Sequence, residues 1–397
     1  MSEATAQLSE AARDPVPSLA GVAAAAAPLP ARAAPLNAGV GPLGWTRVNL
    51  FGSIPSAITT VVLTAVIVWW LSGLLSWGII HAVWTVPITP EGVVDTTACR
   101  TAYGVGACWA MVSDKWRLIL FGRFPYDEQW RPAIVLGLFL ALYVISAMKR
   151  FWRKGLLLVW VATLAVNGAL MWGGVLGLSY VPEDVWGGLP ITLMLATFGI
   201  AFAFPLSLVL ALGRRATGLP AIKMLCVAFI ELIRGVPLVT LLFMAIVMFP
   251  LIMPEGFDLN QLLRAQMAIV FFAAAYLAEI VRGGLQALPK GQYEAADALG
   301  LSYWEKTGFI ILPQALRMVI PPLVNTFIGL FKDTSLVLII GLFDLLGTGK
   351  LAIADPIWQG HSTEIYLVLA VMYFVPCYIM ARYSRGLEAE LSRGVRR

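Results

Sequence analysis

Residues 294–313 read EAADALGLSYWEKTGFIILP and form a polar, charged segment between two long apolar runs. The segment is rich in residues that favour helix, yet it carries charges that the core of a bilayer does not accept. It is therefore expected to lie outside a membrane, between two helices that cross it.

The composition of the whole chain is that of an integral membrane protein. Of its 397 residues, 59% are hydrophobic and 13% are charged, and the mean hydropathy is +0.81. Soluble proteins contain about 25% charged residues. The net charge of +5 does not indicate nucleic-acid binding, because an excess of Lys and Arg in a membrane protein usually marks its cytoplasmic loops.

We predict an all-α polytopic membrane protein with about eight transmembrane helices. The apolar runs are continuous, which favours helices over a β-barrel, and many reach the roughly 20 residues that a crossing needs. They lie near residues 55–80, 132–148, 155–178, 189–213, 224–253, 265–288, 314–348 and 364–382. The seventh run is too long for one straight crossing, and we predict a break at Lys332 and Asp333. Arg234-Gly235-Val236-Pro237 predicts a kink in the fifth, because proline removes a backbone donor.

Lysine and arginine predict the orientation of the helices. The basic residues that follow or precede alternate spans are Lys149, Arg150, Arg153, Lys154, Arg214, Arg215, Lys290, Lys306, Arg382, Arg385, Arg393, Arg396 and Arg397. With eight crossings they all lie on one side, together with both termini, and the positive-inside rule makes that side the cytoplasm. Residues 1–45 are rich in Ala and Pro and lack the pattern of a signal peptide, so we expect a disordered cytoplasmic tail.

The predicted outer loop, residues 81–131, contains Cys99 and Cys108. An oxidising compartment would favour a Cys99–Cys108 disulfide, and two free thiols in a folded loop are the alternative. Residues 46–180 then form an N-terminal extension of three spans and this loop. Residues 181–397 carry every motif that we find.

The segment that starts at Glu294 predicts a helix, a glycine turn and a second helix. Gly300 occupies the position of a left-handed helix stop, and Ser302 with Glu305 fits a capping box. The residues that cluster at the turn are Leu299, Leu301, Tyr303 and Trp304. An exposed apolar group with a charged rim is typical of a docking site, whereas an amphipathic helix on lipid headgroups is the alternative.

The segment resembles the loop by which membrane subunits of ABC importers bind their ATPases. It matches the pattern EAA-x3-G-x9-I-x-LP completely, and the matching residues are Glu294, Ala295, Ala296, Gly300, Ile310, Leu312 and Pro313. Three further segments are similar to the polar amino acid subfamily of these permeases: FIELIRGVPLV (229–239), AYLAEIVRGGLQALPKGQYEAA (275–296) and LFKDTSLV (330–337). The long N-terminal part resembles the larger permease subunits of general L-amino acid importers, the AapM/BztC type.

The resemblance implies a permease core with five spans and a transport mechanism of alternating access. It implies an ATPase dimer that binds ATP and Mg²⁺, a second permease subunit, a periplasmic binding protein and L-amino acid substrates. The location that it implies is the bacterial inner membrane, with no cofactor in this chain. The residues that it implies for ATPase docking are Glu294, Ala295, Ala296, Gly300, Leu301, Trp304, Leu312 and Pro313. Whether the second permease is identical or homologous stays open, as do the amino acids carried.

Ionisable groups inside the spans are candidates for the translocation path, since burying them in a bilayer is expensive. The candidates are Glu279, Arg282, Glu231, Arg234, Lys332 and Asp333. The polar Asn325 is a further candidate, for which we favour an interhelical hydrogen bond over a place in the path. Glu279 with Arg282, and Glu231 with Arg234, share a helix face at a spacing of three residues. The alternative is that such pairs only neutralise one another and fix helix packing. Gly283 and Gly284 predict a close approach between helices.

Catalytic motifs do not emerge from the sequence. GTGK at 347–350 fails as a phosphate-binding loop, because Asp344 replaces the first glycine and Leu351 follows the lysine. His81 and His361 lack metal-ligand spacing. We therefore expect a transporter rather than an enzyme, with a secondary transporter or a channel as the alternative to an ABC permease.

Overall fold

The computed structural model describes residues 41–393 apart from 91, 93, 154, 176, 217, 255, 257 and 258. Most of the predicted tail therefore lies outside the described residues, as do Lys154, Arg396 and Arg397 of the predicted cytoplasmic charges. The chain divides into two compact units, Met1–Trp77 and Gly78–Arg397.

The first unit contains α3 (Pro42–Asn49) and α4 (Ile54–Leu75), which continues as a π-helical turn over Ser76–Ile80. Ser53 caps α4 by accepting from the Ser56 amide, and the Thr60 hydroxyl donates to the Leu50 carbonyl at 2.9 Å. None of the residues of α4 is buried. A helix that is apolar on all sides is suited to lipid.

Seven helical segments are long and apolar enough to cross a membrane, and they confirm seven of the predicted spans in type and place. They are Ile54–Ile80, Tyr126–Ala147, Gly155–Trp172, Gly188–Arg214, Gln261–Ala287, Tyr303–Ile340 and Ser362–Glu390. The remaining predicted span is a helix pair, Pro220–Arg234 and Leu238–Ile252, bent by 105° at the break. The bend confirms the kink predicted before Pro237, and counting the pair as one crossing gives the eight spans expected.

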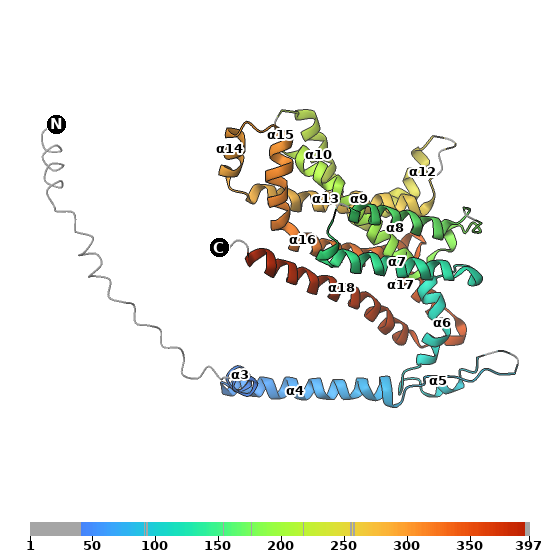
Figure 1. Ribbon diagram of the computed structural model, residues 1–397. Coiled ribbons are helices and arrows are strands. Elements are labelled where there is room, and N and C mark those ends of the chain that lie inside the picture. The colour runs from blue at the N-terminus through green and yellow to red at the C-terminus, as the bar shows by residue number, and fades with distance from the viewer. Residues whose placement is uncertain are drawn as a thin grey trace, which may run out of the picture. The chain divides into compact units, whose positions relative to one another are not determined.

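Three helices form the centre of the second unit. α13 (Gln261–Ala287) packs against α9 (Gly188–Arg214) on one side and α16 (Leu312–Asp333) on another (Figure 1). A Cβ on Gly284 would lie 2.6 Å from Val319 Cγ1, so glycine is what allows α13 and α16 to come this close. Gly283 faces open space, and its predicted role in packing is wrong.

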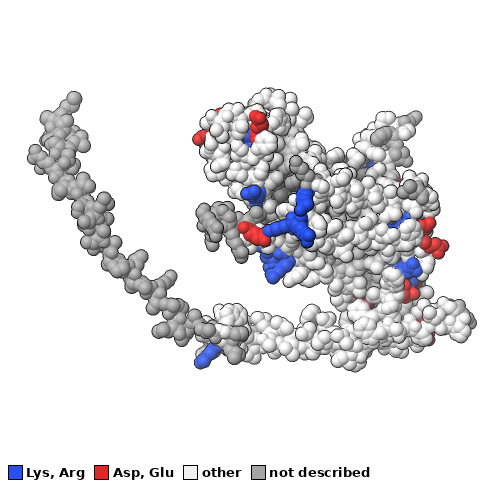
Figure 2. Space-filling model, in the orientation of Figure 1, with Lys and Arg blue, Asp and Glu red and all other residues white. Residues whose placement is uncertain are grey.

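The other helices surround this centre. They are α7 (Trp130–Ala147), α8 (Gly155–Trp172), α10 (Pro220–Arg234), α11 (Leu238–Phe243), α12 (Phe249–Ile252) and α18 (Ser362–Arg393). Between α11 and α12 the chain forms a π-helix, Met244–Met248. Figure 2 shows few charged groups on the face that it draws, with wide uncharged areas between them, as expected where lipid covers the protein.

Two predicted spans are longer than the helices that form. α8 ends at Trp172 rather than at residue 178, because Arg131 of α7 is fully buried and donates to its last carbonyls, Leu170 at 2.6 Å and Met171 at 3.2 Å. The predicted run 314–348 merges two elements. α16 ends at Asp333 as expected and a 3₁₀-helix follows over Thr334–Ile340, but the apolar residues beyond belong to α17 (Leu345–Ile353).

The second unit has two ends, one with the short helices that follow α13 and the other with the loop that follows α4. At one end α14 (Lys290–Ala298) and α15 (Tyr303–Glu305) lie beyond the helix bundle (Figure 1). The last turns of α18 meet the α7–α8 connection, where the Tyr383 hydroxyl donates to the Ala147 carbonyl at 3.3 Å and Lys149 pairs with Glu390. At the other end α6 (Trp109–Phe121) packs on α17 and on the start of α18.

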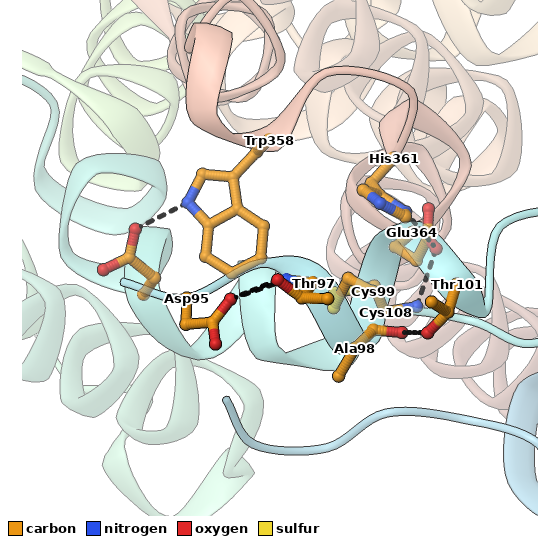
Figure 3. Close-up of a disulfide and its surroundings, with 10 residues drawn as sticks. Asp95, Thr97, Ala98, Cys99, Thr101, Cys108, Trp358, His361 and Glu364 are labelled. Atoms are coloured by element: carbon orange, nitrogen blue, oxygen red, sulfur yellow. Dashed lines mark hydrogen bonds and ion pairs between the residues drawn. A yellow bond between two sulfur atoms is a disulfide. The ribbon is translucent and has the colours of Figure 1, made fainter. Parts of the chain in front are cut away.

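The loop that follows α4 is attached to this second end through buried groups. Cys99 and Cys108 form a disulfide with a Cα–Cα distance of 5.4 Å, and both residues are fully buried. The Cys108 amide donates to Glu364 Oε1 at 2.8 Å, and Figure 3 shows Glu364 between the disulfide and His361. Trp358 donates to Asp114 at 2.8 Å. The loop of the N-terminal extension is thus part of the same core as the start of α18.

Candidate functional site

The segment around Gly300 folds as the sequence predicts. α14 ends in a Schellman motif, in which the Leu301 amide donates to the Ala296 carbonyl at 3.3 Å and the Gly300 amide to the Asp297 carbonyl at 2.9 Å. Gly300 has a φ of 70°, a conformation that suits glycine and strains most other residues. The turn therefore depends on this residue.

The next helix starts at the predicted capping box. The Glu305 amide donates to the Ser302 hydroxyl, and Glu305 Oε2 accepts from the Ser302 amide at 2.9 Å. A π-helix, Lys306–Ile311, leads directly into α16, and Lys306 forms an ion pair with Asp297 across the turn. A π-helix is rare and often marks a functional site.

An apolar surface projects from this loop, which we call the docking loop (residues 290–313). Leu299, Trp304 and Phe309 are 75%, 74% and 80% exposed, and Tyr303 is half exposed. Glu294, Ala295 and Pro313 are also exposed, whereas Leu301 and Leu312 are partly covered and Ala296 is buried. Phe309 lies outside the turn, in the π-helix Lys306–Ile311, and the sequence did not single it out. Large apolar side chains exposed around a polar turn are typical of a protein interface.

Arg215 and Tyr293 attach the docking loop to the bundle. The Tyr293 hydroxyl donates to the Leu285 carbonyl of α13 at 2.7 Å and accepts from Arg215 at 3.0 Å. Arg215, just beyond α9, also donates to the Leu285 carbonyl at 3.1 Å. Hence hydrogen bonds connect α14 to α13 and to the residue that follows α9.

A polar cluster lies near the same end of the bundle, centred on Glu279 of α13. Arg282 donates to Glu279 Oε2 from Nη2 at 2.7 Å and from Nε at 3.0 Å, as its helical spacing predicts. Arg214 of α9 donates to Glu279 Oε1 at 2.8 Å, and Arg234 of α10 approaches Oε2 at 3.8 Å. Glu231 of α10 joins through Arg214, at 2.9 Å. Three helices thus meet at one carboxylate.

The predicted pairing of Glu231 with Arg234 is not what forms. Glu231 forms its ion pair with Arg214 instead. The guanidinium carbon of Arg234 lies 5.5 Å from the centre of the Tyr276 ring, and Arg234 faces Glu279. The sequence reading placed Arg214 among the loop charges and missed its role. The sequence shows Arg214 and Arg215 side by side at the end of α9. Their partners lie at least 17 residues away along the chain, so no local spacing could reveal them.

The remaining path candidates lie outside this cluster. Asn325 and Lys332 are exposed on α16, and Asp333 is partly covered at its end. The interhelical hydrogen bond predicted for Asn325 is not found within the described part of the chain. Among those same residues there is no group of three side chains with metal-ligand character.

Comparison with known proteins decides the family. Residues 203–393 match the family described as binding-protein-dependent transport system inner membrane component. Over 357 residues the chain is 44% identical to the inner membrane amino-acid ABC transporter permease protein YhdY of Escherichia coli K12, covering 88% of this chain and 93% of that relative. The chain belongs to the amino acid ABC transporter permeases.

Two further matches describe this permease's relatives. It is 37% identical over 413 aligned residues to BztC, a glutamate/glutamine/aspartate/asparagine transport system permease of Rhodobacter capsulatus, covering 89% of this chain and 94% of that one. A crystal structure of an amino acid ABC transporter with histidines is 30% identical and matches 51% of this chain and 92% of its own, with a TM-score of 0.46. Because the long relatives align with nearly the whole chain, they share most of the N-terminal extension as well.

Membership fixes the general role of the chain. It is a multi-pass permease subunit of the inner membrane and belongs to an amino acid importer. It is the membrane component of that importer and not a catalytic subunit. The alternatives of a secondary transporter and a channel no longer apply.

Proposed function

We propose that this permease carries L-amino acids from the periplasm to the cytoplasm by alternating access, driven by an ATPase dimer bound at its docking loop. ATP and Mg²⁺ belong to that ATPase, a periplasmic binding protein delivers the substrate, and a second permease subunit completes the path. The name of BztC supports glutamate, glutamine, aspartate and asparagine as the first substrates to test.

The observation that carries the docking role is the exposed apolar surface on a rigid helix–turn–helix. Leu299, Trp304 and Phe309 would insert into the ATPase, with Glu294, Ala295 and Gly300 shaping the contact. The Schellman turn and the capping box hold these side chains in one arrangement before the partner arrives, which lowers the entropic cost of binding.

The polar cluster around Glu279 is proposed as the element that opens and closes the path. Its three arginines and two glutamates belong to α9, α10 and α13, so a shift of any one helix breaks or remakes ion pairs. Arg214 and Arg215 are adjacent, and the second holds the docking loop. A movement of α14 driven by the ATPase is thereby passed to the cluster, which suits a rigid-body switch with two states. Asn325, Lys332 and Asp333 lie outside the polar cluster, and we keep them as proposed residues of the translocation path.

We also propose the orientation and the division of the chain. The end with the docking loop, Lys149 and the last turns of α18 faces the cytoplasm, and both termini lie on that side. The end with the Cys99–Cys108 disulfide faces the periplasm, where such bonds persist. Residues 46–180 form an extension to the core at 181–397, and an extension of this size favours a homologous rather than an identical second permease.

The test is reconstitution of the chain with the ATPase, the second permease and the binding protein of its importer. ATP-driven uptake of L-amino acids into proteoliposomes, and loss of ATPase copurification in the Leu299→Asp, Trp304→Asp variant, would support the proposal. Uptake without ATP, or unchanged copurification of the ATPase with that variant, would contradict it. Lys223→Asp, an exposed charge change on α10, is the matched control.

A further inference from the structure

Basic side chains surround the place where the last turns of α18 meet the α7–α8 connection. Figure 2 shows Lys and Arg side chains gathered at this end of α18, with an acidic group beside them. The two acidic residues of these turns, Glu388 and Glu390, are exposed. The described cations are also exposed, and we call them the basic patch: Lys149, Arg150, Arg153, Arg382 and Arg385.

Most cations of the basic patch have no anionic partner in the chain. Lys149 pairs with Glu390, and Arg385 Nε donates only to the Ala381 carbonyl of its own helix, at 3.4 Å. The side chains of the other three arginines form no ion pair within the described part of the chain. Neighbouring like charges repel one another, so an anion from outside the chain would stabilise this surface.

The basic patch projects from a folded surface rather than from a loose tail. The Lys149–Glu390 pair joins the α7–α8 connection to α18. Within that connection, Trp152 Nε1 donates to the Ser146 carbonyl and Trp160 Nε1 to the Ser146 hydroxyl, both at 2.9 Å. The cations of the N-terminal extension and those of the last helix are therefore held at one junction.

Exposed apolar side chains lead up to the basic patch on both elements. On α18, Phe374 and Tyr378 are exposed, their ring centres lie 5.7 Å apart, and they share a helix face with Arg382 at a spacing of four residues. On α8, Leu157 and Leu158 are exposed two and three residues after the connection ends. All four apolar residues belong to helices long enough to cross a membrane, so acyl chains cover them.

The combination of unpaired arginines and apolar helix faces defines the chemistry of a ligand. A guanidinium group binds phosphate oxygens with two parallel donors. A soluble anion would meet the arginines and leave the apolar faces uncovered. An anionic phospholipid offers a phosphate to the arginines and acyl chains to the helices, and clusters of Lys and Arg at the end of a membrane helix are typical of such sites.

We propose that the basic patch binds the headgroup of an anionic phospholipid of the phosphatidylglycerol kind, whose acyl chains lie along α8 and α18. The lipid adds a second connection between the N-terminal extension and the last helix of the core, beside the Lys149–Glu390 pair. It belongs to the leaflet at the end that carries the docking loop. No step of the proposed transport cycle depends on it.

The experiment is native mass spectrometry of the assembled complex, titrated in detergent with phosphatidylglycerol or with phosphatidylcholine of the same acyl chains. The wild type is expected to bind phosphatidylglycerol more tightly. The double variant Arg150→Gln, Arg153→Gln should weaken that binding about 25-fold, because each cation near an anionic headgroup contributes about fivefold. Its binding of phosphatidylcholine should not change.

Two further variants sharpen the test. Arg382→Gln, Arg385→Gln removes the same charge from α18 and is expected to weaken phosphatidylglycerol binding by a similar factor. Lys223→Gln, Arg317→Gln replaces two exposed cations outside the basic patch and is the matched control, with binding unchanged. Glycerophosphoglycerol, the headgroup without acyl chains, should not displace the lipid.

Equal affinity of the wild type for the two lipids, or unchanged phosphatidylglycerol affinity in either double variant of the basic patch, would overturn the proposal. Displacement of the lipid by an equal concentration of glycerophosphoglycerol would assign the basic patch to a soluble anion instead. Loss of the ATPase from the Arg150→Gln, Arg153→Gln complex with lipid binding unchanged would assign it to a protein partner.

Discussion

At the scale of single residues, Arg214 and Arg215 take partners in different parts of the molecule. Arg214 lies between Glu231 and Glu279, and Arg215 holds Tyr293 of the docking loop. Neighbouring residues on a helix end point in different directions, so one dipeptide serves two sites. Through this dipeptide and the Arg215–Tyr293 hydrogen bond, α9 contacts both the docking loop and the polar cluster.

Tyr293→Phe is expected to uncouple the docking loop from the polar cluster. It removes a hydroxyl that makes two hydrogen bonds of about 1 kcal/mol each, while the apolar docking surface stays intact. ATPase copurification should persist and the rate of uptake per ATP hydrolysed should fall severalfold. Tyr303→Phe, whose hydroxyl is exposed, is the control, and an unchanged ratio of uptake to hydrolysis in Tyr293→Phe would refute the coupling role.

Glu279→Gln is expected to impair uptake more than any other change in the cluster, since it leaves three arginines around a neutral amide. Adding Arg282→Gln should restore only part of the activity, because Arg234 still lacks the Glu279 carboxylate and Arg214 keeps only Glu231 as a partner. Uptake kinetics on the assembled complex check this. Complete rescue by the double variant would show that Glu279 and Arg282 only neutralise one another. Glu231→Gln, at a more exposed site, should impair uptake less than Glu279→Gln.

At the scale of elements, the docking loop shows how a few local signals define a surface. The left-handed residue at Gly300 and the capping box at Ser302 orient two short helices, and the exposed aromatic residues follow from that orientation. Both signals are short-range, which is why the sequence predicts them. The π-helix at Lys306–Ile311 has no such local signal.

Gly300→Asn is expected to keep uptake, and Gly300→Val to abolish it. Asn tolerates a positive φ, whereas a β-branched side chain strains it, and space is available around the position, so the effect is one of backbone conformation alone. Uptake and ATPase copurification of the two variants at matched expression provide the test. Full activity of Gly300→Val would show that the turn is not required.

The ion pair of Lys115 and Asp355 joins α6 to the segment before α18 at 2.7 Å, and it predicts a pH dependence. The Lys115 bond lowers the pKa of Asp355 below 3.8, and although burial alone would lower the pKa of Lys115, its bonds to Asp355 and Asp114 raise it above 10.5. The carboxylate contribution is present above pH 3.8 and is lost as the pH falls through the lowered pKa. The ammonium contribution is present below pH 10.5 and is lost above the raised pKa.

Lys115→Met is therefore expected to destabilise the protein by about 1 kcal/mol or less at pH 7, as measured for pairs near a surface. The difference in thermal midpoint between variant and wild type should shrink as the pH falls from 3.8 through the lowered pKa of Asp355. A difference that does not depend on pH throughout the acid range would assign the effect to packing of the lysine stem instead.

The sequence predicts the helices of this protein better than their contacts. Continuous apolar runs give the spans, since a bilayer imposes its thickness on them. The end of α8 is missed because Arg131 reaches its carbonyls from another helix, and the boundary before α17 is missed because a buried loop helix is as apolar as a span. The roles of Arg214 and Arg215 escape prediction for the same reason, since their partners are distant in the chain.

At the scale of the whole molecule, the charges divide the second unit into a basic end and an end with the disulfide. Single-cysteine labelling in a variant without Cys226 and Cys377 tests which end faces out. A cysteine at Val105, which is 60% exposed, should react with an impermeant maleimide in intact cells, and a cysteine at Trp152, 54% exposed, should react only after permeabilisation. The reverse pattern would invert the proposed topology.

The buried disulfide has a consequence for how the protein is made. Cys99 and Cys108 are both inaccessible once the loop has packed on Glu364 and Trp358, and a thiol oxidant needs direct access to a thiolate. The bond therefore has to close while the loop is still loose, before the last span is in place. The order of events during biogenesis follows from this. Cys99 and Cys108 are oxidised first, and their loop then packs against α18, whose Glu364 is synthesised more than 250 residues later.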